Sequence, residues 1–237
     1  MEITLPYGMD AVGVVAAIND LYAYLHALNR ASIQYGYDRL EDIQLRAAFS
    51  GLVSEIMVRS LAASMSNRVP GLARNQYPNG HPDLVPRAMY PGDAVQNGDA
   101  GVEVKAARNP TSIQAHNTGE GWYAVIEFSC DVKTLPIYDR EPTIIRRVRI
   151  AYLEHTDWSF SGRSETSRRT PTASITRGGR AKLDAGTVYV LGGSAGYEKY
   201  AKSLKSLRQE VGAPLTPRSP HKLHERPPLL AEEPGIV

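Results

Sequence analysis

The chain has 237 residues, of which 42% are hydrophobic and 22% charged, so its composition is that of a globular protein and excludes wholesale disorder. The 27 Lys and Arg residues against 25 Asp and Glu give a net charge of +2, which by itself indicates no class of partner. The single cysteine, Cys130, excludes an intramolecular disulfide framework and a multi-cysteine zinc site.

No targeting or membrane segment is expected from the N-terminal sequence. The first dozen residues contain acids and no Lys or Arg, unlike a secretory signal peptide. The uncharged apolar run from Ala11 to Ile18 is far shorter than the roughly 20 residues of a membrane span. We therefore expect a cytoplasmic protein that does not associate with a membrane.

The N-terminal part is predicted to be helical. A helix over residues 10–30, with Asp10 as its N-cap, is indicated by apolar side chains at helical spacing. A second helix is predicted over residues 40–66, ending before Pro70-Gly71. The apolar stripe of the first helix consists of Val15, Ile18, Leu21, Leu25 and Leu28. This stripe is either core or a candidate subunit interface.

Residues 69–101 are rich in Pro, Gly and Asn and leave room for only one short strand, at 81–85. Strands are then predicted at 101–107, 122–130, 143–153, 172–176 and 187–191, followed by a closing helix at 196–211. Residues 212–237 contain six prolines and no periodicity, so we interpret them as a disordered or draped tail.

This order of elements predicts an α+β (mixed α/β) fold, with a central mixed sheet flanked by helices. Residues 1–211 are expected to form a single domain, with a helical part at about 1–66 and a sheet at about 80–191.

Acidic and basic side chains gather around the first strands of the predicted sheet. In residues 101–107 the alternation of a strand directs Glu103 and Lys105 to one face, and Val102 and Val104 to the other. A hairpin beginning after Pro82-Asp83 would bring Asp83 beside Glu103. Two neighbouring carboxylates repel unless a cation lies between them, and hard oxygen ligands suit Mg²⁺. Taken alone, Glu103 and Lys105 favour a plain surface ion pair.

The pattern of Pro82, Asp83, Glu103, Val104 and Lys105 resembles the PD-(D/E)xK nuclease superfamily over roughly residues 40–155. The compact size and the Pro-rich loop before Asp83 are most similar to type II restriction endonucleases. The resemblance implies a restriction-endonuclease-like core and catalysis with Mg²⁺ held by Asp83 and Glu103. It also implies a catalytic Lys105 and a further carboxylate on the preceding helix, for which Glu55 is the candidate.

Two histidines flank this pattern. His116, between two predicted strands, is a candidate phosphate or base contact or an assisting base, and His81 precedes Pro82. His116 is equally compatible with a solvent-facing loop histidine. Exonuclease branches of the superfamily place Tyr four residues after a helical Gln, whereas Thr118 follows Gln114 here, which disfavours a processive exonuclease.

Positive charge is concentrated downstream of the first strands. Residues 140–182 contain 10 Lys and Arg against 4 Asp and Glu, a net charge of +6. Arginines among Ser, Thr and Gly suit contacts to phosphates and guanine edges, so we expect this segment to bind double-stranded DNA. The candidate DNA-binding residues are Arg163, Arg168, Arg169, Arg177, Arg180 and Lys182.

The leading hypothesis is a Mg²⁺-dependent endodeoxyribonuclease that acts as a homodimer, since cutting both strands with one site per chain calls for two copies. A repair, phage or mobile-element nuclease with looser sequence preference is the nearest competing hypothesis. Two further hypotheses come from different classes of protein. One is a catalytically inactive nucleic-acid-binding protein of the same fold, and the second is an interaction protein in which the pattern is coincidental.

Overall fold

The computed structural model describes residues 4–108, 114–115, 119–135, 139–160, 173–192 and 197–203. Its helices are α1 (Ala11–Gln34), α2 (Leu40–Ile43), α3 (Arg46–Ser64) and α4 (Arg177–Ala185), and residues 197–203 are also helical. Its strands are β1 (Leu72–Arg74), β2 (Leu84–Pro86), β3 (Val102–Ala107), β4 (Gln114–Ala115), β5 (Gly121–Ser129), β6 (Ile144–Leu153), β7 (Trp158–Phe160), β8 (Ala173–Ile175) and β9 (Thr187–Val190).

The main sheet has six strands in the order β1-β2-β3-β5-β6-β9. β3 and β5 are parallel, in a register that runs from Val102 opposite Trp122 to Ala107 opposite Glu127. The other neighbouring pairs are antiparallel. The prediction of an α+β fold with a central mixed sheet flanked by helices is confirmed.

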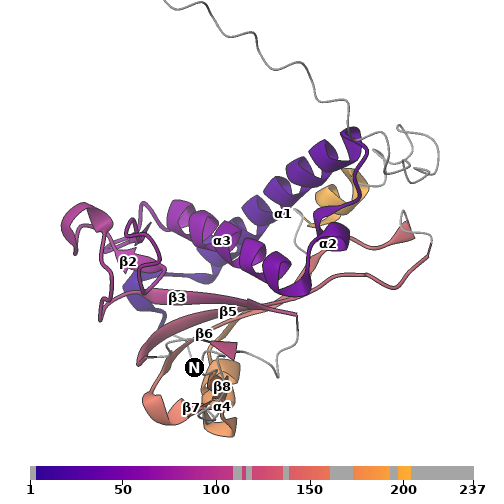
Figure 1. The fold of residues 1–237 in the computed structure, drawn as a ribbon. Helices are drawn as coiled ribbons and strands as arrows, with labels where there is room; N and C mark the ends of the chain where they lie inside the picture. The colour runs from indigo at the N-terminus through magenta and orange to yellow at the C-terminus, as the bar shows by residue number, and fades with distance from the viewer. Residues whose placement is uncertain are drawn as a thin grey trace, which may run out of the picture.

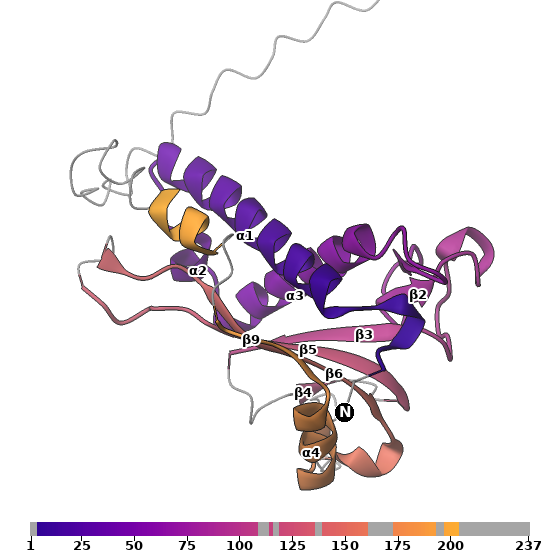
Figure 2. The same cartoon turned by 180° about the vertical axis from the view of Figure 1, so that it is seen from behind.

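Helices α1 and α3 pack side by side over one face of the main sheet (Figures 1 and 2). Asp10 caps α1 as expected, since its side chain accepts a hydrogen bond of 2.7 Å from the Gly13 amide. Ile18, Leu21 and Leu25 of the apolar stripe are fully buried in the core beneath these helices. The stripe is therefore core packing, each side chain contributing about 1.5–3 kcal/mol, and its central part is not exposed for a subunit interface.

A smaller apolar cluster occupies the opposite face of the sheet. The three-stranded sheet β4-β8-β7 and helix α4 lie on this side (Figures 1 and 2). The ring centroids of Tyr123 on β5 and Trp158 on β7 are 5.1 Å apart, and Leu183 of α4 is fully buried. The main sheet is thus covered on both faces.

The predicted helix over residues 40–66 is two helices. Gln44 and Leu45 have extended backbone, with ψ of 146° and 145°, and separate α2 from α3. Tertiary contacts override helix propensity at this break. Before it, the buried Arg39 pairs with Glu41 and Asp42 of α2, and after it α3 packs over β3.

The prediction of only one short strand within residues 69–101 was wrong, because β1 and β2 both lie there and pair with each other. Strands of three residues are too short to leave a clear alternation in the sequence.

No helix was predicted in the basic segment ending at Lys182, but Arg177–Ala185 form α4. Thr176 caps this helix by accepting a hydrogen bond from the Gly179 amide. Gly179 is required by close packing, because a Cβ atom there would lie 2.9 Å from the Asp157 carbonyl oxygen. Two consecutive glycines therefore obscured the helix in the sequence.

By length and composition α1 could cross a membrane, a test that the core helices of globular proteins also pass. Here α1 contacts α3 and β9 in the core. Residues 204–237, which include the end of the predicted closing helix and the Pro-rich tail, lie outside the described residues.

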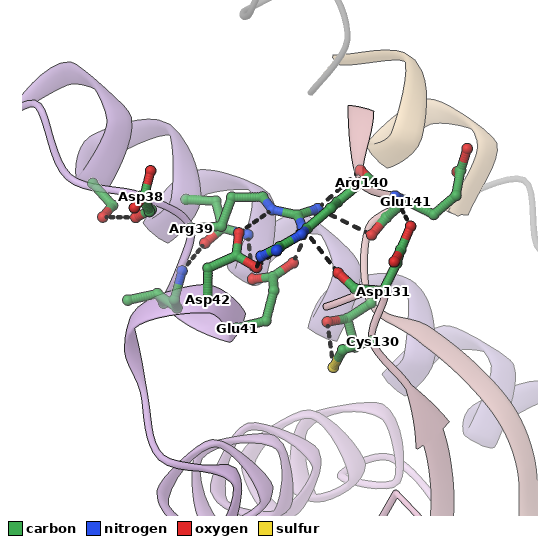
Figure 3. Close-up of polar contacts among 12 residues, drawn as sticks. Asp38, Arg39, Glu41, Asp42, Cys130, Asp131, Arg140 and Glu141 are labelled. Atoms are coloured by element: carbon green, nitrogen blue, oxygen red, sulfur yellow. Dashed lines mark hydrogen bonds and ion pairs between the residues drawn. The ribbon is translucent and has the colours of Figure 1, made fainter. Parts of the chain in front are cut away.

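A buried arginine joins the helical layer to the far end of the β5–β6 hairpin (Figure 3). Arg39 is only 2% exposed, and its guanidinium donates to the carboxylate of Asp42 at 2.9 Å. It also donates to the carbonyl oxygens of Asp131, Arg140 and Glu141, at 3.4, 3.1 and 3.0 Å. The Arg39 side chain thereby satisfies hydrogen-bond acceptors both on α2 and in the connection between β5 and β6.

Arg39→Ala is expected to lower the free energy of unfolding by about 3–5 kcal/mol, because it leaves the buried Glu41 carboxylate without its counter-ion. Chemical denaturation followed by circular dichroism measures this. Arg68→Ala is the matched control, since Arg68 forms an exposed pair with Asp10 at 2.7 Å and should cost less than about 1 kcal/mol. Equal losses in the two variants would contradict a structural role for Arg39.

Candidate active site at the edge of β2 and β3

Asp83, Glu103 and Lys105 come together where β2 meets β3. The two strands pair antiparallel through Leu84 and Val102, which places Asp83 beside Glu103. Val102 and Val104 are buried on the α3 side, and the ammonium group of Lys105 contacts Glu103 Oε1. The arrangement expected from the alternation in residues 101–107 is therefore present.

Backbone amides fix both carboxyl groups. The Val104 amide donates to Asp83 Oδ2 at 2.8 Å, and the Asp83 amide donates to Glu103 Oε2 at 3.2 Å. The Asp83 carboxyl group thus accepts from β3, and the Glu103 carboxyl group accepts from Asp83, the residue before β2. Such reciprocal bonds hold the two side chains in one arrangement without a bound ligand.

His81 is a third partner of Glu103. Its Nδ1 lies 2.9 Å from Glu103 Oε2. The His81 backbone is anchored as well, because its amide donates to the Gln96 carbonyl and its carbonyl accepts from the Gly98 amide at 2.7 Å. The sequence marked His81 only as a flanking histidine. Residues 81–83 precede β2, so strand alternation in the sequence gave no signal for this contact.

The two carboxyl groups have opposite pKa shifts. Burial, and next the negative charge of Glu103, raise the pKa of Asp83 to about 6. Burial acts in the same direction on Glu103, but the hydrogen bond from His81 and the charge of Lys105 outweigh it and lower its pKa to about 2. The bond to Glu103 raises the pKa of His81. Near neutral pH Glu103 is fully ionised, and Asp83 is the carboxyl that gains or loses a proton.

Asp83, Glu103 and His81 line a cleft of about 360 Å³, and Lys105 is not among its lining residues. The backbone around the cleft is held by the side chain of Asn75, which is 6% exposed. The side-chain amide of Asn75 donates through Nδ2 to the backbone carbonyls of Pro82 and Val95, at 2.9 and 2.8 Å. Its Oδ1 accepts from the backbone amides of Tyr77 and Val95. The cleft is lined by Glu55, Val58, Arg74, Asn75, Tyr77, Asn79, Gly80, His81, Asp83, Asn97 and Glu103.

The helical carboxylate expected from the resemblance also reaches this cleft. Glu55 of α3 is among the lining residues, and its Oε2 lies 3.5 Å from Nη2 of Arg74 on β1. Within the described residues its ion-pair partner is thus Arg74. Glu55 shares the cleft with Asp83 and Glu103 from a separate element.

Of the remaining predicted residues, those that the structure describes do not line this cleft. His116, Arg163, Arg168 and Arg169 lie outside the described residues. Arg177, Arg180 and Lys182 belong to α4, which packs against β6. The Lys182 ammonium group is engaged in ion pairs with Glu154 at 2.8 Å and Asp157 at 2.6 Å.

The donor set where β2 meets β3 fits Mg²⁺. Asp83 and Glu103 offer hard carboxylate oxygens. Burial, and next the negative charge of Glu103, raise the pKa of Asp83, and a bound cation would relieve the repulsion between the two acids. Mg²⁺ commonly keeps several waters and takes only one or two protein carboxylates. Among the described residues no group of three or more His, Cys, Asp or Glu side chains is arranged to hold a metal, so this site would supply two ligands.

Comparison with protein-family models, curated proteins and solved structures finds no match for this chain. The case for a catalytic site therefore depends on the residues and geometry described above.

Opposite pKa shifts predict opposite effects of neutralising the two acids. The pKa of Asp83 is raised on folding, so ionisation costs stability as the pH rises through about 6. Asp83→Asn should therefore stabilise the metal-free protein by about 1–2 kcal/mol at about pH 7, and by less at about pH 5. Asn keeps an acceptor for the Val104 amide.

The pKa of Glu103 is lowered, so its contribution is fully present above the ordinary range of Glu and is lost only as the pH falls toward about 2. Glu103→Gln should thus destabilise the protein at both pH values. Thermal unfolding in EDTA measures all four cases. Shifts of the same sign for the two variants at neutral pH would refute this electrostatic description.

Proposed function

We propose that the protein is a Mg²⁺-dependent endodeoxyribonuclease of the PD-(D/E)xK type, most similar to type II restriction endonucleases. The observation that carries the proposal is the clustering of Asp83, directly before β2, with Glu103 and Lys105 of β3, beside a cleft that the two acids line. The order of α3, the β1–β2 hairpin, β3 and β5 also supports it, since it follows the order of that superfamily's core.

Each residue of the cluster has a distinct role in this proposal. Asp83 and Glu103 would hold Mg²⁺, which when bound acidifies water and stabilises charge on a phosphate group. Lys105, beside Glu103, stabilises the negative charge that builds on the attacking oxygen and the phosphoryl group. His81 holds Glu103 in place. The water oxygen joins phosphorus, the bond to the leaving sugar oxygen breaks, and that oxygen takes up a proton.

Double-stranded DNA is the proposed substrate, and a homodimer that cuts both strands is the proposed active form. The basic stretch of residues 140–182 supports DNA binding, with a net charge of +6. Lys182 forms ion pairs with two acids, so we expect the arginines at 163, 168 and 169 to contribute more to DNA binding. A DNA-binding protein of the same fold that does not cleave is the alternative.

A plasmid-nicking assay with Mg²⁺ and with EDTA tests the proposal. The wild-type protein should cut supercoiled DNA only with Mg²⁺. Asp83→Ala, Glu103→Ala and Lys105→Ala should each abolish detectable cutting, a loss of at least about 10²-fold, because each removes a metal ligand or the cation beside the reacting groups.

DNA binding should persist in these variants, and the two acid variants should bind more tightly because a carboxylate that repels phosphate is gone. Asp20→Ala, on the exposed face of α1, is the control and should cut like wild type. If correctly folded Glu103→Ala protein cut at the wild-type rate, the nuclease assignment would lose its basis.

A further inference from the structure

The charged side chains around the cleft differ in how firmly they are engaged. Three carboxylates, those of Glu55, Asp83 and Glu103, line the cleft and would repel a phosphate group. His81 and Lys105 both contact Glu103 and are thereby occupied. Arg74 is the arginine among the lining residues, and its ion pair in the described structure is with Glu55.

The pair between Arg74 and Glu55 is loose. A single N–O distance of 3.5 Å joins them, and their side chains are 39% and 59% exposed. Arg39 and Arg149, by contrast, are 2% and 3% exposed and pair with two carboxylates each. An exposed pair contributes little to stability, so Arg74 can exchange Glu55 for another anion at small cost.

The backbone that carries Arg74 is rigid and lies beside the acids. Arg74 is directly opposite Leu84 in the β1–β2 pairing. The amide of the next residue, Asn75, donates to the Asp83 carbonyl at 2.9 Å, and the Asn75 side chain fixes the adjoining loop. The guanidinium therefore extends from a fixed base into the cleft that contains Asp83 and Glu103.

We propose that Arg74 forms a phosphate-binding subsite of this cleft, for a phosphodiester group of a nucleic-acid backbone, and that Glu55 is its counter-ion when no substrate is bound. The inference rests on the proposed function and deepens it. A guanidinium presents a planar fork of donors that matches two phosphate oxygens. Its positive charge also offsets the repulsion from the three carboxylates.

The test measures affinity for a fluorescein-labelled DNA duplex by anisotropy in EDTA across a salt series, together with plasmid nicking in Mg²⁺. Arg74→Ala should bind about tenfold more weakly, because a charge-assisted contact is lost. The slope of log K against log salt should become shallower by about 0.9, the value for one phosphate contact. The affinity of Arg74→Lys for the duplex should lie between those of the wild type and Arg74→Ala, since Lys keeps the charge but loses the planar fork of donors.

Glu55→Gln should bind more tightly, because the competing carboxylate is gone. Arg68→Ala is the matched control: its side chain is 41% exposed and pairs with Asp10 outside the cleft, and it should bind like wild type. Circular dichroism and thermal unfolding establish that each variant is folded.

The outcomes separate this inference from the proposed function. If the wild type cuts DNA while Arg74→Ala binds and cuts like Arg68→Ala, the subsite is refuted and the nuclease proposal stands. If binding depends on Arg74 but the wild type never cuts, the subsite is supported and the nuclease proposal fails. A wild-type protein that neither binds nor cuts DNA overturns both.

Discussion

The candidate site depends on one buried negative charge, that of Glu103. His81 and Lys105 lie against its two oxygens and keep it ionised despite burial. The same charge raises the pKa of Asp83 and of His81. A buried charge that loses its partner costs about 3–5 kcal/mol, so these side chains act as a unit and the loss of one alters the others.

The fold produces this unit by using the two faces of one strand differently. Val102 and Val104 anchor β3 in the core under α3, and the alternation of the strand then directs Glu103 and Lys105 away from that core. β1 and β2 are only three residues long, so the sheet edge ends close to Asp83. Asn75 satisfies the backbone groups left unpaired there, and the cleft opens beside the acids.

The sequence predicted those features of the fold and the site that depend on the spacing of nearby residues. The strand at 102–107, the shared side of Glu103 and Lys105, and the Asp10 cap of α1 all follow from spacing alone. β1 is too short to leave a pattern, and the glycines at 178 and 179 hide α4. The contacts that shape the site could not be predicted, because they join residues distant in the chain.

Three polar residues illustrate this limit. His81 meets Glu103 through a loop anchored at Gln96 and Gly98. Arg74 meets Glu55 across two elements, and Asn75 bonds to a loop twenty residues away. Composition and spacing carry no signal for such pairings. The arginines at 163, 168 and 169 remain a prediction from composition.

The central claim is that Asp83 and Glu103 form a divalent-cation site, and calorimetric titration of the protein with MgCl₂ near neutral pH tests it most directly. The account predicts saturable binding to the wild type, with protons released because a partly protonated Asp83 must ionise to bind. It predicts that binding is lost in Asp83→Asn and retained in Lys105→Ala, since an ammonium group is not a ligand. Equal binding by wild type and Asp83→Asn would contradict it.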